Sequence, residues 1–299
     1  MTILNNTSDG LHPELIVLFR TVTFLGEVDV DDLIRLCFPP DVTNDALVLS
    51  RLKGSLSRWI ELGLFVKTDK NTIQLDSRFV KGKKESLEEF TNKLPSITRH
   101  ILLEDKNSRP LWNEKSSAVA SDFVKGISWL LAQDIYGFPS TWNGGAEGIH
   151  NLQVNNDVSI FQNDTRWNNL KHWARYLGFA TGDGGSFQID PTQAIKEELP
   201  LIFDGQKDLP AKDFLLKLSS QLPVFDGGIY RQEIEKNLNT TTWRRPDEGQ
   251  LSMSLSFALQ RLALNRKIKL YGKSDTGSSF RLAGKDYRIW IGFEFVSVL

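Results

Sequence analysis

The sequence predicts a mainly α fold with small β-hairpins, an α+β class built from tandem winged-helix modules. Two observations lead to this prediction. Three successive segments carry apolar residues at helical spacing before the period changes to that of a β-hairpin, and the end of this pattern appears again further along the chain. We divide the 299 residues into module 1 (1–80), a helical connector (81–112), module 2 (113–195) and module 3 with a C-terminal strand (196–299).

Module 1 shows the three helices and the hairpin in order. The first helix covers 13–25, where apolar residues fall every three or four positions, and Gly26 ends it. A shorter helix follows in DVDDLIRLCF, opened by acidic residues and closed by two prolines. The third helix runs from about 44 to 62, and LFVKTD and TIQLD then alternate around a polar turn. This is the winged-helix order, in which the third helix can enter the major groove of DNA.

Module 2 repeats the end of module 1. The segment RWNNLKHWARYLGFATGDGGSFQID follows the order of LKGSLSRWIELGLFVKTDKNTIQLD: a tryptophan, a helix-ending glycine, an aromatic residue and a hairpin. We therefore expect Trp59 and Trp173 to be core residues at equivalent positions. SAVASDFVKGISWLLAQD is predicted to be a helix, whereas IYGFPSTWNGGAEGIHNLQ reads mostly as loop.

Module 3 begins after the linker-like FDGQKDLPAK. Helices are predicted in FLLKLSSQLP, GGIYRQEIEKNL and LSMSLSFALQRLAL, and KIKLYGKSDTGSSFRLAG is expected to form the wing. The closing YRIWIGFEFVSVL has the pattern of a strand, and it needs a pairing partner because an exposed apolar edge would aggregate. The connector between modules 1 and 2 is predicted to be helical and to pack beside module 1.

Bulk properties exclude several classes of protein. The 36 basic and 37 acidic residues give a formal net charge of −1, which excludes a supercharged chain but leaves local asymmetry open. Cys37 is the only cysteine, so a disulfide framework within one chain is impossible; its apolar surroundings indicate a buried thiol. No apolar run approaches bilayer length and the start lacks a secretory signal, so we expect a cytoplasmic protein without a membrane partner.

The most basic part of the sequence is the third helix and wing of module 3. Clustered cations there suit contact with the phosphates of double-stranded DNA; the alternative is ordinary solvated charge. The DNA-binding residues predicted in and before this region are Arg244, Arg245, Arg261, Arg266, Lys267, Lys269, Lys273 and Arg281.

In module 1 a second set of cations lies on the third helix and its wing. An acidic segment precedes them, so docking of this module onto a protein stays open as the alternative. Module 2 carries a weaker basic patch on its last helix, where we expect His172 to be a partly buried structural residue. The DNA-binding residues predicted in module 1 are Arg51, Lys53, Arg58 and Lys70.

No catalytic centre, cofactor site or metal site is predicted. YGKSDTG is similar to the end of a phosphate-binding loop, but Lys267 stands where the first glycine is required, and no helix follows. Glu104 and Lys106 have the E-x-K spacing of metal-dependent nucleases, but no second acidic residue stands out on an earlier paired strand. The four histidines are scattered without zinc-type spacing.

The segments MTILNNTSDGLHPELIVLFRTV and RLKGSLSRWIELGLF resemble the start of the DpdG-like family. This family belongs to the bacterial Dpd cluster, which inserts 7-deazaguanine derivatives into DNA and restricts unmodified DNA. The resemblance rests on the ILN…SDG start and the helix that ends in RW-ELGLF. It implies a role in defence against foreign DNA beside separate motor and nuclease subunits, and it carries no catalytic residues.

Three hypotheses follow for the function. The leading one is a non-enzymatic DNA-binding or DNA-sensing subunit of a bacterial anti-phage DNA modification and restriction assembly, whose partners are double-stranded DNA and other subunits. The alternative is a protein-interaction scaffold whose winged helices dock partner subunits. The third is a divergent metal-dependent nuclease that uses Glu104 and Lys106. Clustered basic residues on a third helix and wing favour DNA, whereas mixed or acidic faces favour docking.

Overall fold

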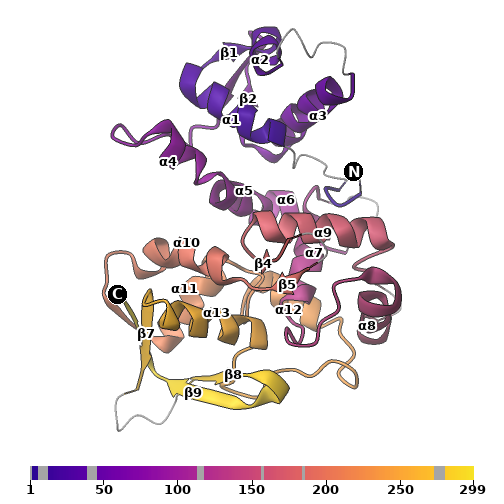
Figure 1. Cartoon of the computed structure of the whole chain (residues 1–299), viewed down its shortest axis with the longest axis vertical. Helices are drawn as coiled ribbons and strands as arrows, with labels where there is room; N and C mark the ends of the chain where they lie inside the picture. The colour runs from indigo at the N-terminus through magenta and orange to yellow at the C-terminus, as the bar shows by residue number, and fades with distance from the viewer. Residues whose placement is uncertain are drawn as a thin grey trace.

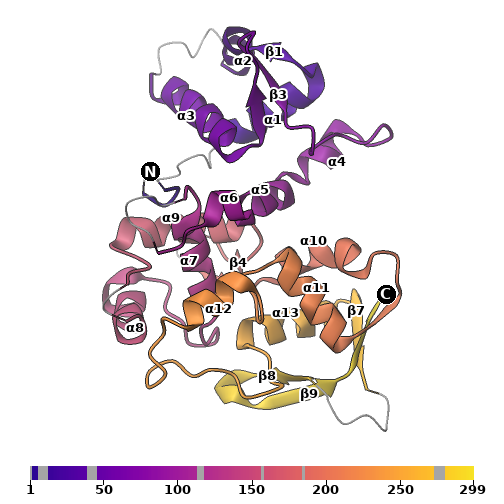
Figure 2. The same ribbon diagram turned by 180° about the vertical axis from the view of Figure 1, so that it is seen from behind.

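The structure is a computed structural model that describes residues 2–5, 13–38, 46–112, 118–155, 158–183, 186–272 and 280–299. Helices dominate and the strands form small antiparallel sheets, so the predicted α+β class is confirmed. The N-terminal unit, from α1 to β3, lies at one end of an elongated molecule, and the last strands lie at the other (Figures 1 and 2). Every helix in the described part of the chain is too short or too polar to cross a bilayer.

The N-terminal unit contains the three predicted helices and the hairpin. One further strand, β1, which the sequence pattern does not indicate, pairs with β3, so that the sheet order is β1-β3-β2. Asp29 ends β1 and caps the next helix, because its side chain accepts hydrogen bonds from two backbone N–H groups of that helix. The predicted ends at Pro39, Pro40 and Asn44 lie outside the described residues. The elements are α1 (Pro13–Leu25), β1 (Val28–Asp29), α2 (Val30–Cys37), α3 (Ala46–Leu62), β2 (Phe65–Lys67) and β3 (Thr72–Leu75).

The connector is helical, as predicted, and comprises α4 (Leu87–Thr91), α5 (Leu94–Leu103) and α6 (Asp105–Ser108). Ser86 and Glu89 form a capping box at the start of α4. The ring of Phe90 stacks on that of Phe19 with centroids 5.1 Å apart, so α4 packs on α1, which agrees with the predicted position of the connector.

The middle region consists of α7 (Ser121–Leu130), the π-helix η3 (Trp142–Ala146), α8 (Glu147–Gln153), α9 (Asp164–Tyr176), β4 (Ala180–Thr181) and β5 (Gln188–Ile189). The helix and hairpin predictions are confirmed, but the loop prediction is wrong for Glu147–Gln153, which forms α8. His150 of α8 is buried among the rings of Trp129, Trp142 and Phe161. This burial stabilises a helix that the local sequence pattern does not predict.

The C-terminal region contains the three helices predicted for module 3 and one more. The additional helix, α10, was not predicted, and the boundary proposed at 195/196 falls inside it. A strand, β6, forms within the segment that reads as a linker. The elements are α10 (Thr192–Phe203), β6 (Asp208–Pro210), α11 (Ala211–Gln221), α12 (Ile229–Glu235), α13 (Met253–Leu264), β7 (Ile268–Tyr271), β8 (Phe280–Ala283), the 3₁₀ turn η4 (Lys285–Tyr287), β9 (Ile289–Phe293) and β10 (Phe295–Val298).

The hairpin predicted within KIKLYGKSDTGSSFRLAG is wrong. β7 pairs with β10 and β8 pairs with β9, so the closing strand lies beside both halves of the expected wing. The chain turns at 284–288, where the Gly284 N–H donates to the Arg288 carbonyl at 2.7 Å. β6 pairs with the other edge of β10. The closing segment therefore has the partners that its apolar character required, because it buries Phe293 and Val296 between them.

Candidate nucleic-acid interface

α3 keeps one long face in solvent. Trp59 and its apolar neighbours point into the core, and the opposite side of the helix exposes Ser50, Gly54 and Ser57. At 100° per residue, Arg51 and Lys53 lie on the two flanks of this small-residue stripe. A narrow stripe between two cations lets a helix approach a groove closely while the flanks reach the phosphates.

The hairpin beside α3 adds two further cations. Lys67 of β2 and Lys70 of the β2–β3 turn are exposed, and the Thr68 and Thr72 hydroxyls bond to each other at 2.6 Å across that turn. Within the described part of the chain, neither lysine has an ion-pair partner, and the same holds for the two flanking cations of α3. These four residues, Arg51, Lys53, Lys67 and Lys70, form what we call the α3–hairpin surface.

Arg58 does not belong to this surface. Its guanidinium donates to Glu61 at 2.6 Å, and its side chain is only 11% exposed. Its charge predicts a contact with DNA, and it lies on the same flank of α3 as Arg51, but Glu61 holds its guanidinium and the protein covers most of its side chain.

α13 cannot act as the groove-reading helix that its sequence suggests. All twelve of its residues are described, and among them only Arg261 and Leu264 are exposed. The helix packs between α10 and the strands β7 and β8. Arg261 itself forms an ion pair with the buried Asp190 and lies over the ring of Phe257. The charge of Arg261 is therefore paired with a carboxylate of the protein itself.

Three more predicted cations of module 3 are held by intramolecular contacts. Arg281 donates to the Glu248 carbonyl at 2.6 Å, and Arg245 pairs with Glu235 at 3.4 Å. Arg244 pairs with Asp247 at 3.3 Å and lies over the ring of Tyr287. These three arginines can bind a phosphate only if each first gives up its contact within the protein.

The remaining cations of module 3 cluster at the start of β7. Arg266, Lys267 and Lys269 are exposed, and no ion pair links them to another described residue. Lys273 lies outside the described residues. The structure therefore offers two separate basic surfaces, of which only the α3–hairpin surface includes an exposed helix face.

A sequence profile of the DpdG-like family matches residues 1–276. The chain belongs to the DpdG-like family. The match extends far beyond the N-terminal segments that carry the resemblance in the sequence, and the family suggests a component of the Dpd system. Comparisons with curated proteins and with solved structures give no match.

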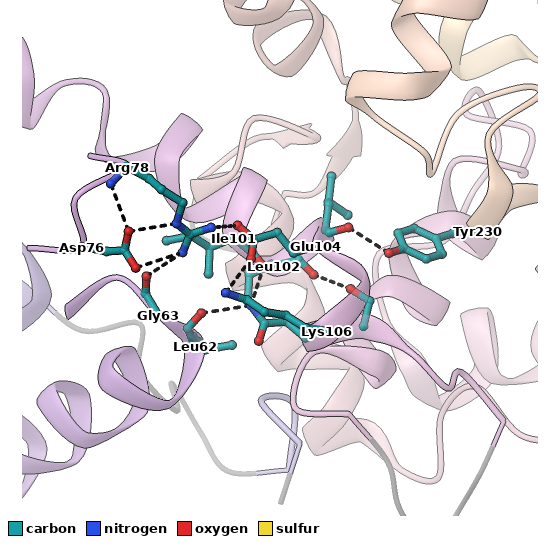
Figure 3. Close-up of polar contacts among 12 residues, drawn as sticks. Leu62, Gly63, Asp76, Arg78, Ile101, Leu102, Glu104, Lys106 and Tyr230 are labelled. Carbon is teal, nitrogen blue, oxygen red and sulfur yellow. Dashed lines mark hydrogen bonds and ion pairs between the residues drawn. The ribbon is translucent and has the colours of Figure 1, made fainter. Parts of the chain in front are cut away.

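In this DpdG-like chain, Glu104 and Lys106 belong to a polar junction that holds the C-terminal end of α3 (Figure 3). Glu104 pairs with Lys106 at 2.9 Å and also with Arg78, which donates to the Gly63 carbonyl at 3.1 Å. Asn107 donates to the Leu62 carbonyl at 3.0 Å. The junction satisfies carbonyls that the end of α3 leaves without helical partners.

The same contacts bear on nuclease chemistry. Glu104 lies between α5 and α6, not on a strand, and its carboxylate already has two cationic partners. Among the described residues, no group of three histidine, cysteine, aspartate or glutamate side chains is arranged to hold a metal ion. This geometry gives the E-x-K pattern of the DpdG-like chain a structural role.

The weaker patch of module 2 is also engaged. Lys171 donates to the Ser140 carbonyl at 3.0 Å, and burial lowers its pKa. Arg175 donates to the Ser186 carbonyl at 2.6 Å. His172 is exposed, contrary to the expected partial burial.

Cys37 is half-buried, and this burial raises the pKa of its thiol, which agrees with an unreactive cysteine.

Proposed function

We propose that this DpdG-like chain binds double-stranded DNA through α3 and the β2–β3 hairpin, as a non-enzymatic subunit of a cytoplasmic Dpd assembly. In this proposal the N-terminal unit is a winged helix, α3 is the helix that enters the major groove, and the hairpin is the wing. The exposed face of α3 is the observation that carries the proposal. The modular repeat remains a prediction for the other two regions.

Charge and shape support the same surface. Arg51 and Lys53 flank a stripe of small residues, and Lys67 and Lys70 extend the positive charge onto the hairpin. Since none of the four is neutralised by an ion pair within the described part of the chain, their charge is available to phosphates. Membership of a family of the Dpd system supports DNA as the ligand.

A salt titration of binding to duplex DNA tests the proposal. Each phosphate contact contributes about −0.9 to the slope of log affinity against log salt, so Arg51→Ala/Lys53→Ala should flatten the slope by about 2. Arg266→Ala/Lys269→Ala is the matched control, because it removes the same charge from the other basic surface. The proposal fails if only the control flattens the slope, or if the intact chain binds no duplex at low salt.

Docking of a partner subunit is the second candidate function. Helix α1 exposes Ile16, Val17 and Phe24, the last with 77% of its surface in solvent. An apolar helix face of this kind is typical of protein contacts. Phe24→Asp should abolish co-purification with other subunits of the Dpd assembly under this alternative, whereas it should leave the salt slope on DNA unchanged.

A further inference from the structure

A cavity of about 320 Å³ lies away from the α3–hairpin surface, between the turn after α7, helix α8 and the loop before α13. Phe138, Trp243 and Tyr287 give it aromatic walls, and the guanidinium of Arg244 lies 4.1 Å from the centre of the Tyr287 ring. A cavity of this size with flat apolar walls suits a planar organic ligand.

Two glutamines that line this cavity are more than nine-tenths buried. The Gln133 Nε2 donates to the Trp129 carbonyl at 2.9 Å, and the Gln153 Oε1 accepts from the Trp129 indole N–H at 3.1 Å. A carbonyl only accepts and an indole N–H only donates, so these two bonds fix the orientation of both amides. Gln133 Oε1 and Gln153 Nε2 are left without a hydrogen-bond partner among the described residues. Each of these two lining residues thus keeps one amide atom, an acceptor on Gln133 and a donor on Gln153, that no described residue uses.

The backbone beside the cavity is strained. Asp286 and Tyr287 both adopt left-handed φ angles, 56° and 59°, in the turn between β8 and β9, where glycine or asparagine is usual. The contact with Arg244 and a hydrogen bond from Gln250 Nε2 to the Tyr287 carbonyl hold this conformation. Strain of this kind persists where surrounding contacts impose it, and it gathers at ligand sites.

We propose that this cavity binds a nucleobase. The aromatic walls supply stacking surfaces, Gln133 Oε1 accepts from an N–H of the base, and Gln153 Nε2 donates to a carbonyl or ring nitrogen. The base comes either from a free nucleotide or from an extrahelical position in DNA, and both sources present the same edge chemistry. The inference goes beyond the proposed duplex binding and does not depend on it, because the α3–hairpin surface contributes no residue to the cavity.

Calorimetric titrations of the full chain with AMP, GMP, CMP and UMP test the proposal, with ribose 5-phosphate as the base-free probe. The key variant is Gln133→Met, because the Trp129 carbonyl keeps its bond from the Ala132 N–H at 3.0 Å and the fold is retained. We expect at least one nucleotide to bind, about tenfold more weakly to Gln133→Met, and ribose 5-phosphate not to bind. Gln206→Met, an exposed glutamine outside the cavity, is the control and should bind like the original chain.

A duplex with a single extrahelical base, compared with the fully paired duplex, identifies the source. If the chain prefers the duplex with the extrahelical base and Gln133→Met abolishes this preference, the base in the cavity comes from DNA. If nucleotides bind and this preference is absent, the base comes from free nucleotides. The proposal is overturned if no nucleotide binds better than ribose 5-phosphate and the duplex with the extrahelical base binds no better than the fully paired duplex. It is also overturned if Gln133→Met changes neither the affinity for nucleotides nor the affinity for the duplex with the extrahelical base. Arg51→Ala/Lys53→Ala should leave nucleotide binding intact, so the two proposals fail separately.

Discussion

The indole rings of Trp59 and Trp173 pack against each other with their centroids 6.2 Å apart. Trp59 lies on α3 and Trp173 on α9, and both are fully buried, as the sequence predicts. Phe123 of α7 joins them at 6.2 Å from Trp173. The repeated segments thus meet at their matching tryptophans, so the α3–hairpin surface is anchored in a core that it shares with the middle of the chain.

Replacing either tryptophan with alanine should lower the free energy of unfolding by about 3–5 kcal/mol, because each substitution leaves a large cavity. The double variant should lose less than the sum, since the ring contact is lost only once and is worth about 0.5–1.5 kcal/mol. Urea denaturation of the four chains measures both effects. Losses under about 1 kcal/mol for both single variants would show that the matching positions are accidental.

Arg261→Ala should affect folding and not DNA binding. The substitution leaves the Asp190 carboxylate, which is 2% exposed, without its cationic partner, and this should cost about 1–3 kcal/mol of stability. We expect the salt slope on duplex DNA to be unchanged. Arg266→Ala, which removes an exposed cation five residues further along the chain, is the comparison for stability and should stay within about 0.5 kcal/mol. A flattened salt slope for Arg261→Ala would show that Arg261 of α13 contacts DNA after all.

His150 should make the fold sensitive to mild acid. Burial lowers its pKa below 6.5, and the ring is neutral: Nε2 accepts from the N–H groups of Ile160 and Phe161. Below pH 6.5 the unfolded chain therefore binds more protons than the folded one, and stability falls as the pH drops toward the folded pKa. His150→Gln should weaken this dependence in urea titrations at pH 7.5 and 5.5. An unchanged dependence would mean that another group titrates.

Purified protein should show neither Mg²⁺-dependent DNA cleavage nor ATP hydrolysis. The Glu104 carboxylate forms ion pairs with Arg78 and Lys106. Glu104→Ala should therefore loosen the junction at the end of α3 without removing a catalytic metal ligand. Cleavage assays with supercoiled plasmid, with and without EDTA, measure this. Cleavage that is present in the original chain and absent in Glu104→Ala would establish the nuclease hypothesis.

The sequence by itself determined the local elements and the chain's membership of a family. The bounds of α1, the hairpin after α3 and the repeated order of tryptophan and helix-ending glycine follow from side-chain periodicity and from glycine, which act over a few residues. The N-terminal motifs pointed to the DpdG-like family, which the profile match confirms over most of the chain. The closing strand was recognised for the same local reason, its alternating apolar pattern.

The tertiary structure alone decided which cations remain available and which strands pair. Charge density favoured module 3, but α13 is buried there and Arg261 pairs with Asp190, a residue of the middle region. The same long-range packing pairs β7 with β10 and creates the cavity between α8 and the turn at Tyr287. Ion pairing, strand order and cavity shape depend on distances between residues far apart in the chain, and a single sequence records charge and periodicity but not those distances.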